Sequence, residues 1–456
     1  MLAAANPDYE FVGIDFNPSH IAEARSLAAR ANISNVAFID TSFGNAARSS
    51  DGRLAEFDIV VMHGVYTWVE RAVRADICDF IREKLLAGGL LYNSYNVLPG
   101  WATATPIQHL LMEVARRSPR DSIAALKEGY ELLRIMNEKS SGFVTQNPGI
   151  KAHIENMGKQ DRSYLVHEFL NAGWEPLYVT DVMANFAEAK LTFVGSATLL
   201  ENMIDLCVPK DLQPMVSAAP DLAMRELLKD YAVNKQFRRD IYVKGPQPMA
   251  QQEQRQRFRE VVFTLATMDK DLPEKFTLPV GEMKPKREAL MLLTNRMRDK
   301  PTSGGDLIAA GEKVGLRESE VALLLILLVQ GGQVAPSRPD HATVDRSASD
   351  RLNDTIMALP VEGDTHQFLC SPVQGSAFTT PFVDRLVAPL IAKSPNESDA
   401  KIARQGFERL EKLGRGFYRE GKVLEKTDQN IQEIAGAVKE FRDLRLPRWR
   451  ALGVIG

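Results

Sequence analysis

The stretch YEFVGIDFNPSHIAEAR, Tyr9–Arg25, has the pattern of a strand, a turn and a helix. The run that ends at Asp15 is almost wholly apolar, as in a parallel strand whose sheet is covered by helices on both faces. Asn17 then supplies a side-chain cap, and Pro18 suits the first helical position. In a doubly wound sheet, the Asp15 carboxylate can accept hydrogen bonds from both ribose hydroxyls of a nucleotide-type cofactor. A simple turn-capping role for Asp15 remains the alternative.

Length, composition and charge narrow the class of protein. A chain of 456 residues suggests roughly three domains, and a hydrophobic content of 45% suffices for packed cores. The longest apolar run, Val321–Val329, is far shorter than a membrane span, and no signal segment opens the chain, so we expect a cytoplasmic protein. Three widely separated cysteines argue against disulfides and against a Cys-x-x-Cys metal site. The net charge of -3 gives no electrostatic support for nucleic-acid binding.

Strands alternate with helices in the first 100 residues, after a last helical turn at Met1–Asn6. Beyond the opening unit we predict strands at 36–39, 57–63 and 90–95, and a helix at about 69–86. This spacing favours right-handed crossovers and a mostly parallel, Rossmann-like sheet. The run at 57–63 has the composition of a buried strand. A helical insert is predicted at 101–171. Later strands are predicted at 174–179, 191–197 and 239–243, the last two forming an antiparallel edge.

The character of the chain changes after residue 245. A Gly-, Pro- and Gln-rich run to Gln256 is typical of a linker. Three helices at 287–297, 306–314 and 318–329, closed by Gly331-Gly332, suggest a winged-helix-like unit. In the last segment Ile431, Ile434, Val438, Phe441 and Leu444 fall on one helix face. The predicted α/β architecture comprises a Rossmann-like domain at 1–100 and 172–245, a helical insert (regulatory or acceptor region) at 101–171, a winged-helix-like domain at 257–335 and a mainly helical domain at 350–456.

Several motifs resemble one family. They are FVGID at Phe11–Asp15, HGVYTWV at His63–Val69, LAGGL at Leu86–Leu90, NSYNVLPGW at Asn93–Trp101 and YLVHEFL at Tyr164–Leu170. Together they resemble the class I S-adenosylmethionine-dependent methyltransferases that carry a methyltransferase regulatory domain. Rickettsial protein-lysine methyltransferases, which act on an outer-membrane protein, share this architecture. The resemblance implies S-adenosyl-L-methionine as cofactor and a protein lysine side chain as acceptor.

The resemblance also implies roles for residues that follow the strands. Asp15 would hold the ribose. Ser42 stands where this superfamily often carries an acid near adenine, and the Phe43 ring would cover the base. The methionine end of the cofactor would be lined by the residues that end the strand at 57–63 and begin the next loop, namely His63, Gly64 and Val65.

Further residues are candidates for handling the acceptor. Tyr66 and Trp68 would begin an acceptor channel, with plain packing under a loop as the alternative. Asn96 and Trp101, in the loop after the next strand, face the same region under the same argument. His167-Glu168 would supply a base or orient the nucleophile, or else form a pair on a helix surface. There is no His-Glu-x-x-His motif, so no metal site is predicted.

One part of the family pattern is missing. Class I methyltransferases need a first strand and a Gly-rich turn, and none precedes Tyr9. We therefore expect an amino-terminal truncation, and residues 1–456 alone to be inactive. A degenerate member acting as a binding or dimerisation module is the main alternative. A DNA-binding regulator is a third, weakened because Glu318 and Glu320 open the helix at 318–329 with negative charge. The expected partner is a protein substrate, and a homodimer stays open.

Overall fold

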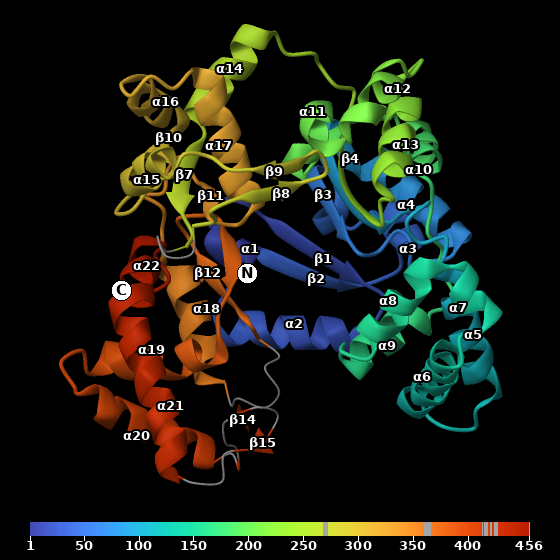
Figure 1. Ribbon diagram of the computed structural model, residues 1–456. Helices are drawn as coiled ribbons and strands as arrows, with labels where there is room; N and C mark the ends of the chain where they lie inside the picture. Colours follow the sequence, from blue (N-terminus) through green and yellow to red (C-terminus); the bar gives the residue numbers. More distant parts are fainter. Residues whose placement is uncertain are drawn as a thin grey trace. The chain divides into compact units, whose positions relative to one another are not determined.

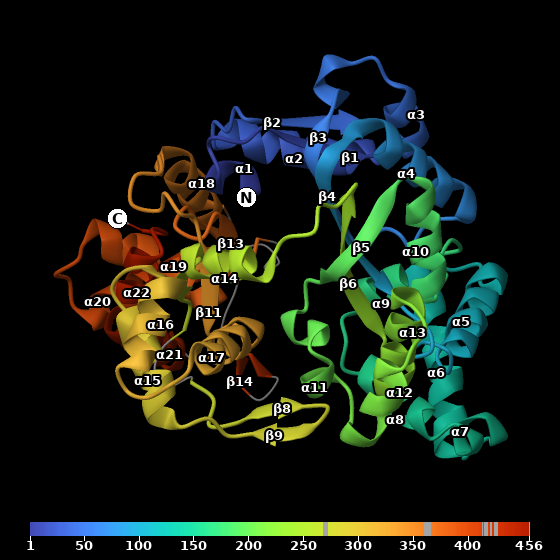
Figure 2. The ribbon, with the colours of Figure 1, turned by 90° about the horizontal axis from the view of Figure 1, so that it is seen from above.

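The computed structural model shows two compact units (Figures 1 and 2). It describes residues 1–267, 272–359, 366–412, 414, 418–419, 422–423 and 427–455. Unit 1 comprises residues 1–41, 249–276 and 283–456, and unit 2 comprises residues 42–248 and 277–282. Among the described residues, no helix combines the length and the apolar character needed to cross a membrane.

Unit 2 is built on a four-stranded mixed sheet with the order β3-β4-β6-β5. Its strands are β3 (Phe57–His63), β4 (Leu85–Asn96), β5 (Leu191–Ser196) and β6 (Phe237–Lys244). β3 and β4 are parallel, whereas β6 runs antiparallel to both β4 and β5. The predicted Rossmann-like α/β class with antiparallel late strands is confirmed, but the sheet is mixed rather than mostly parallel, and the two strands that open the chain pair in a separate sheet. The strand predicted at 174–179 is wrong: only a single bridge joins Leu177 to Val97, and a helix begins at Val179.

β3 is less buried than its composition suggested. Ile59 is 52% exposed and Val61 is 59% exposed. β3 pairs with β4 on one side, and within the described part of the chain no other strand pairs with it. An apolar strand is buried on both faces only where neighbouring strands and helices cover it, and here that cover is incomplete. The prediction of a buried strand at 57–63 was therefore correct in its bounds and wrong in its exposure.

Helices complete unit 2. They are α3 (Phe43–Arg48), α4 (Arg71–Lys84), α5 (Thr105–Arg117), α6 (Ser122–Glu138), α7 (Gly142–Gln146), α8 (Pro148–Met157), α9 (Arg162–Phe169), α10 (Val179–Glu188), α11 (Ile204–Cys207), α12 (Gln213–Ser217) and α13 (Leu222–Val233). Helices α4 and α10 lie beside the sheet in Figure 2, and Phe186 of α10 packs against Tyr242 of β6. Helices α5–α9 have a core of their own, which includes Leu111, Leu126, Ile154 and Phe169. The predicted helical insert is thus present.

Unit 1 contains the strand, turn and helix that open the chain. Its first elements are α1 (Leu2–Ala5), β1 (Phe11–Asp15), α2 (Pro18–Arg30) and β2 (Val36–Asp40). β1 and β2 form a parallel pair in full register, and α2 lies along it in Figure 1. Asn17 caps α2 by accepting a hydrogen bond from the Ser19 N–H, 3.0 Å long, and Ile21 is the buried residue of its apolar face. The predicted elements are confirmed.

The middle of unit 1 differs from the prediction in two places. Its elements are α14 (Gln251–Glu260), β7 (Val262–Leu265), α15 (Arg287–Arg296), β10 (Thr302–Ser303), α16 (Gly304–Glu312), α17 (Glu318–Gln330) and β11 (Val334–Ser337). The hairpin of β8 (Phe276–Leu278) and β9 (Gly281–Met283), between β7 and α15 in the chain, belongs mostly to unit 2. The Gln-rich segment is helical rather than a linker, because Gln, Glu and Arg are all good helix formers. The three predicted helices are confirmed. The strand at the centre of their sheet, β7, precedes them in the chain, so the winged-helix assignment stays a prediction.

The carboxyl-terminal part of unit 1 is mainly helical, as predicted. It contains α18 (Ser347–Ala358), β12 (Phe368–Ser371), β13 (Ser376–Thr379), α19 (Phe382–Lys393), α20 (Asp399–Glu411), β14 (Tyr418–Arg419), β15 (Lys422–Val423), α21 (Thr427–Glu440) and α22 (Leu446–Ala451). Ile434, Val438 and Phe441 are fully buried, yet Leu444 is 36% exposed. A π-helical turn at Phe441–Arg445 explains this, because its wider turn rotates the following residues off the apolar face.

Candidate functional site

Asp15 ends β1 in unit 1 and is engaged in the turn that follows. Its Oδ1 accepts a hydrogen bond from the Asn17 N–H, 2.8 Å long, and its Oδ2 lies 3.2 Å from His20 Nδ1. The side chain remains 39% exposed. A carboxylate has about four acceptor positions, so turn capping leaves Asp15 able to accept further hydrogen bonds. Both sequence-based interpretations of Asp15 are compatible with this geometry.

Ser42 and Phe43 open α3 in unit 2. The Ser42 Oγ accepts a hydrogen bond from the Asn45 N–H at 3.3 Å, so the hydroxyl serves as a helix cap. Ser42 is exposed and Phe43 is half-buried. Both residues lie after the end of β2, and both stay candidates for contacts to a base.

His63 and Gly64 lie at the carboxyl end of β3 in a turn tied to β4. His63 Nδ1 lies 3.0 Å from Ser94 Oγ and 3.1 Å from Tyr92 Oη, and its ring stacks on Tyr92. The Gly64 N–H donates to Ser94 Oγ at 2.9 Å. Gly64 has a φ of +66°, which glycine adopts without strain, while Val65 beside it is half-buried. Parallel pairing sets Ser94 opposite His63, so sequence reasoning with the strand register could have found Ser94.

Tyr66 lies in the core of unit 2. It is fully buried, its hydroxyl accepts a hydrogen bond from Asn185 Nδ2 at 3.2 Å, and its ring centroid lies 4.9 Å from that of Phe186. Burial raises the pKa of Tyr66 above its ordinary value. This placement corresponds to the packing alternative rather than to a residue that lines an open channel.

Trp68 and His167 meet at the edge of the helical insert. Their ring centroids are 4.5 Å apart, His167 is exposed and Trp68 is half-buried. The Trp68 carbonyl oxygen accepts a hydrogen bond from Asn171 Nδ2 at 3.0 Å. The loop after β3 is therefore joined to the segment after α9, and Trp68 stays partly accessible.

Glu168 is the buried partner of Asn96. Asn96, the last residue of β4, is 5% exposed, and its Nδ2 donates to Glu168 Oε1 at 3.2 Å. Glu168 is also 5% exposed. Burial raises the pKa of the Glu168 carboxyl group, and the Asn96 amide, with the nearby Tyr164 and Trp174, limits the rise. The Trp174 indole N–H itself makes no hydrogen bond within the described chain. His167 and Glu168 thus point to different environments, so the pair on a helix surface is not what forms.

Trp101 extends this region with aromatic rings. Its ring centroid lies 5.4 Å from that of Trp174, 5.9 Å from that of His153 and 6.3 Å from that of Phe169. Burial lowers the pKa of His153. The Trp101 indole N–H is buried and has no hydrogen-bond partner among the described residues. The Glu168 cluster, defined as Asn96, Trp101, Tyr164, Glu168 and Trp174, therefore joins a carboxylate to aromatic side chains.

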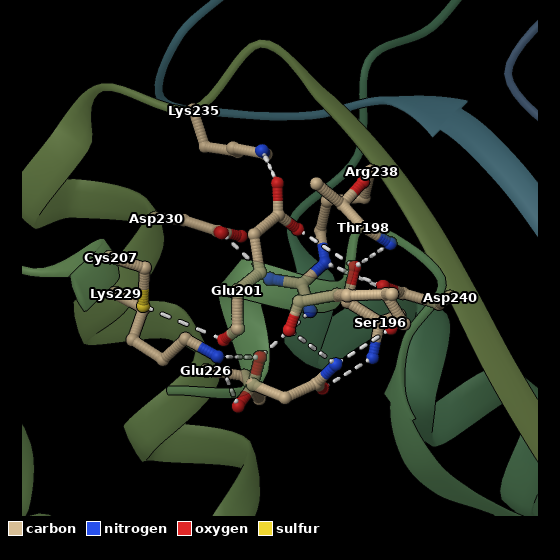
Figure 3. A network of polar contacts seen from close by, with 12 residues as sticks. Ser196, Thr198, Glu201, Cys207, Glu226, Lys229, Asp230, Lys235, Arg238 and Asp240 are labelled. Carbon is tan, nitrogen blue, oxygen red and sulfur yellow. Dashed lines mark hydrogen bonds and ion pairs between the residues drawn. The ribbon is translucent and has the colours of Figure 1, made fainter. Parts of the chain in front are cut away.

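A buried ionic network supports the same end of the sheet from the side of β6 and α13 (Figure 3). Arg238 is 2% exposed and makes ion pairs with Glu226 at 2.8 Å, Asp230 at 2.7 Å and Asp240 at 3.0 Å. Lys229 pairs with Glu226 at 2.9 Å. We call these five residues the Arg238 network. It holds two cations and three acids, and burial raises the pKa of Asp230 to about 7.

The Arg238 network is connected to the loop after β4. The Tyr95 hydroxyl donates to Asp240 Oδ2 at 2.7 Å. In the segment before β6, the Gln236 and Lys235 carbonyl oxygens accept hydrogen bonds from the Val97 and Gly100 N–H groups, each 3.0 Å long. These hydrogen bonds join the Arg238 network, and the segment that precedes β6, to the Asn96–Trp101 loop. Sequence reasoning missed it because its members become neighbours only when β6 pairs with β4.

Comparisons with known proteins place the sequence among its relatives. The family model described as a methyltransferase domain matches residues 1–162, and that of a predicted methyltransferase regulatory domain matches residues 161–244. An uncharacterized protein of Synechocystis sp. is 31% identical over 455 residues, which is 100% of this chain and 88% of that protein. An uncharacterized protein of Rickettsia prowazekii is 25% identical over 238 residues, or 52% of this chain and 42% of that protein.

A solved structure shares the fold. PKMT2 from Rickettsia typhi, in complex with AdoHcy, superposes with a TM-score of 0.70 over 99% of this chain and 90% of PKMT2. At 17% identity this likeness establishes the fold alone. The two family models and the relative that spans the whole chain confirm the family suggested by the sequence motifs. The chain belongs to the class I S-adenosylmethionine-dependent methyltransferases that carry a methyltransferase regulatory domain.

Proposed function

We propose that this protein transfers the methyl group of S-adenosyl-L-methionine to the side-chain nitrogen of a lysine in a protein substrate. The observation that carries the acceptor class is the Glu168 cluster: a carboxylate that is 95% buried among aromatic rings at the end of β4, with no ion pair to a basic side chain in the described chain. A buried carboxyl group without a cationic partner favours a guest that gains positive charge, and a lysine nitrogen gains that charge when it accepts the methyl group.

The cofactor roles follow from place and residue type. Asp15 holds the ribose hydroxyls. Ser42 and Phe43 contact the adenine, the first through its hydroxyl and the second through its ring. The turn at His63-Gly64-Val65 binds the methionine end, where open α/β sheets hold their ligands. The AdoHcy complex of PKMT2 supports the cofactor, since AdoHcy is the product that S-adenosylmethionine leaves after methyl transfer.

Methyl transfer asks the protein mainly for alignment. The acceptor nitrogen displaces the sulfonium in line, so the nitrogen, the methyl carbon and the sulfur must be held at near-attack distance. A lysine has to lose a proton first, which costs about 4–5 kcal/mol from a pKa of about 10.4 to neutral pH. Burial among Trp68, Trp101 and Trp174 favours the neutral amine. His167, at the exposed rim beside Trp68, takes the released proton to water.

In this proposal, Tyr66 packs in the core of unit 2 and does not line the acceptor channel. Its buried ring packs on Phe186 and fixes the loop between His63 and Trp68. The regulatory segment contributes through the Arg238 network, which supports the loop after β4.

The proposed domain boundaries, the winged-helix unit, the cytoplasmic location and a homodimer stay predictions, as does the inactivity of residues 1–456 on their own.

The proposal is tested by titrating S-adenosylmethionine and S-adenosylhomocysteine into residues 1–456 and into the full-length product of the gene, in a calorimeter. Methyl transfer is then measured with tritium-labelled S-adenosylmethionine and poly-L-lysine. Saturable binding and labelled poly-L-lysine are expected for the full-length product. The same result for residues 1–456 would keep the function and overturn the inactivity prediction. Absence of binding in both proteins would overturn the function, and favour a binding or dimerisation module.

A further inference from the structure

Asn96 holds a fixed place at the end of β4. Parallel pairing sets Ser94 opposite His63, and side chains two residues apart on a strand leave the same face, so Asn96 follows Ser94 on the face that His63 uses. Its backbone is tied down on both sides. The Asn96 N–H donates to Thr67 Oγ1 at 3.2 Å, and its carbonyl oxygen accepts from the Leu177 N–H at 3.2 Å. The position of the Asn96 side chain is therefore set by the sheet.

The orientation of the Asn96 amide is set by Glu168. Glu168 Oε1 accepts a hydrogen bond from Asn96 Nδ2 at 3.2 Å, so the NH2 group and not the carbonyl of the amide faces the carboxyl group. The amide is planar, and its Oδ1 consequently points away from Glu168. Within the described chain, no residue donates a hydrogen bond to that oxygen. Asn96 is only 5% exposed, yet its Oδ1 is not fully enclosed, so a donor from a bound molecule can reach this oxygen.

We propose that Asn96 Oδ1 is the acceptor for an N–H of the substrate amine, and that Glu168 is the positioning residue that aims it. This inference rests on the proposed function and specifies how its acceptor nitrogen is held. A neutral amine has two N–H bonds and one lone pair. When one N–H is bound to Asn96, rotation about the bond to the lysine chain is restricted, and the lone pair is held towards the methyl group.

The step balances without a further reactant. The nitrogen lone pair forms the new N–C bond while the C–S bond breaks, and its electron pair stays on sulfur as S-adenosylhomocysteine. The positive charge of the sulfonium passes to the nitrogen, which then releases a proton to water. Asn96 stays neutral throughout and keeps its hydrogen bond to Glu168. Neither residue is chemically changed, so both act by orientation.

Sinefungin provides a probe that needs no knowledge of the protein substrate. In this analogue a carbon bearing an amino group replaces the sulfonium and its methyl, so its amine takes the place of the transferred methyl group and is directed towards the position of the acceptor nitrogen. The affinities of sinefungin and of S-adenosylhomocysteine, which lacks that amine, are measured by calorimetry on each full-length variant. Asn96→Ala is expected to lower the preference for sinefungin about tenfold, the effect of one hydrogen bond to a charged donor. The preference is a ratio within one protein, so a partly unfolded sample does not distort it.

Conservative and control variants separate positioning from structure. Glu168→Gln keeps an acceptor for Asn96 Nδ2 and is expected to retain more of the preference than Glu168→Ala does. The matched control is Asn202→Ala, which removes two hydrogen bonds of 2.8 Å between Asn202 and the Ser196 backbone on β5. It is expected to lower stability and leave the preference unchanged.

The possible outcomes distinguish failure of this inference from failure of the proposed function. An unchanged preference in Asn96→Ala, or equal loss in Glu168→Gln and Glu168→Ala, would overturn the inference while the proposed function stands. A wild-type protein that binds neither compound would overturn the proposed function, and the inference with it.

Discussion

Replacing Asp230 by asparagine is expected to flatten the pH dependence of folding in unit 2. Asp230 is the third acid in a network with two cations, and its Oδ2 is buried without a hydrogen-bond partner in the described chain. Burial raises the pKa of the Asp230 carboxyl group from 3.8 to about 7, with the nearby Asp240 and Glu226 adding to the rise and Arg238 opposing it. Asparagine has nearly the same shape and carries no charge at any pH.

The sign and size follow from proton linkage. The folded pKa lies above the unfolded value, so the folded protein still holds a proton that the unfolded chain has lost. Stability therefore falls as the pH rises from about 4 to about 7, and is level above that. The slope is about 1.36 kcal/mol per pH unit below the folded pKa and about half that at pH 7, where the folded carboxyl group is half ionised, so the interval from pH 5 to pH 7 corresponds to roughly 2 kcal/mol. Over this interval, the unfolding free energy of the wild type should fall by that amount more than the unfolding free energy of Asp230→Asn does.

Urea-induced unfolding at pH 5, 6, 7 and 8 measures this difference. Tryptophan fluorescence reports mainly on unit 2, because Trp68, Trp101 and Trp174 lie there and the chain has four tryptophans in total. Asp211→Asn, at an exposed aspartate of the same unit, is the control and should follow the wild type. Parallel curves for wild type and Asp230→Asn would refute the reasoning, since they would mean that Asp230 is ionised throughout and that the network tolerates its net charge.

Three further outcomes are expected. Asp15→Ala should weaken S-adenosylmethionine binding to the full-length protein by roughly 1–3 kcal/mol in calorimetry, through lost charge-assisted hydrogen bonds, and an unchanged affinity would remove Asp15 from the site. Trp68→Ala should lower turnover far more than cofactor affinity, and equal losses of turnover and affinity would make that ring part of the cofactor pocket. Tyr66→Ala should instead lower the unfolding free energy by about 3–5 kcal/mol, as loss of a buried aromatic ring does. Gly100→Ala should displace the loop after β4, because a Cβ there would lie 2.1 Å from the Lys235 carbonyl oxygen; a stable variant with wild-type turnover would contradict the proposed support of this loop.

Local patterns predicted much of the fold because their causes are local. The apolar run before Asp15, the cap at Asn17 and the proline at the first helical position specify β1 and α2 without help from distant residues. The same holds for β5, β6 and the helices α15–α17. The antiparallel edge could be expected because late strands commonly form such an edge on the sheet of a large α/β domain.

Properties that depend on distant partners could not be predicted. The exposure of Ile59 and Val61 depends on which strands and helices flank β3, and the sequence of β3 does not indicate these neighbours. His167 and Glu168 are adjacent in sequence, yet one is exposed and the other is buried against β4, since consecutive residues on a helix point about 100° apart. The π-helical turn at Phe441–Arg445 likewise left no sequence signal that a 3.6-residue period would reveal.

The candidate site was predicted in its location and only partly in its contacts. Residues after β3 and β4 were expected at one edge of the sheet, and parallel pairing brings those two strand ends together. The partners that fix them, Ser94 for His63 and Glu168 for Asn96, follow from register and from the packing of α9. Tyr66 shows what the sequence cannot decide. An aromatic residue in a loop beside a strand end can serve packing or binding, and only its burial in the folded protein distinguishes the two roles.

The most direct test of the central claim is the chemical identity of the methylated residue. The full-length protein is incubated with tritium-labelled S-adenosylmethionine and, separately, with poly-L-lysine, poly-L-arginine and poly-L-glutamate, and each polymer is hydrolysed for amino-acid analysis. The account predicts label in N-methyllysine from poly-L-lysine alone, lowered by Asn96→Ala and little changed by Asn202→Ala. Label in arginine or glutamate, or none in lysine while S-adenosylmethionine is bound, would contradict it.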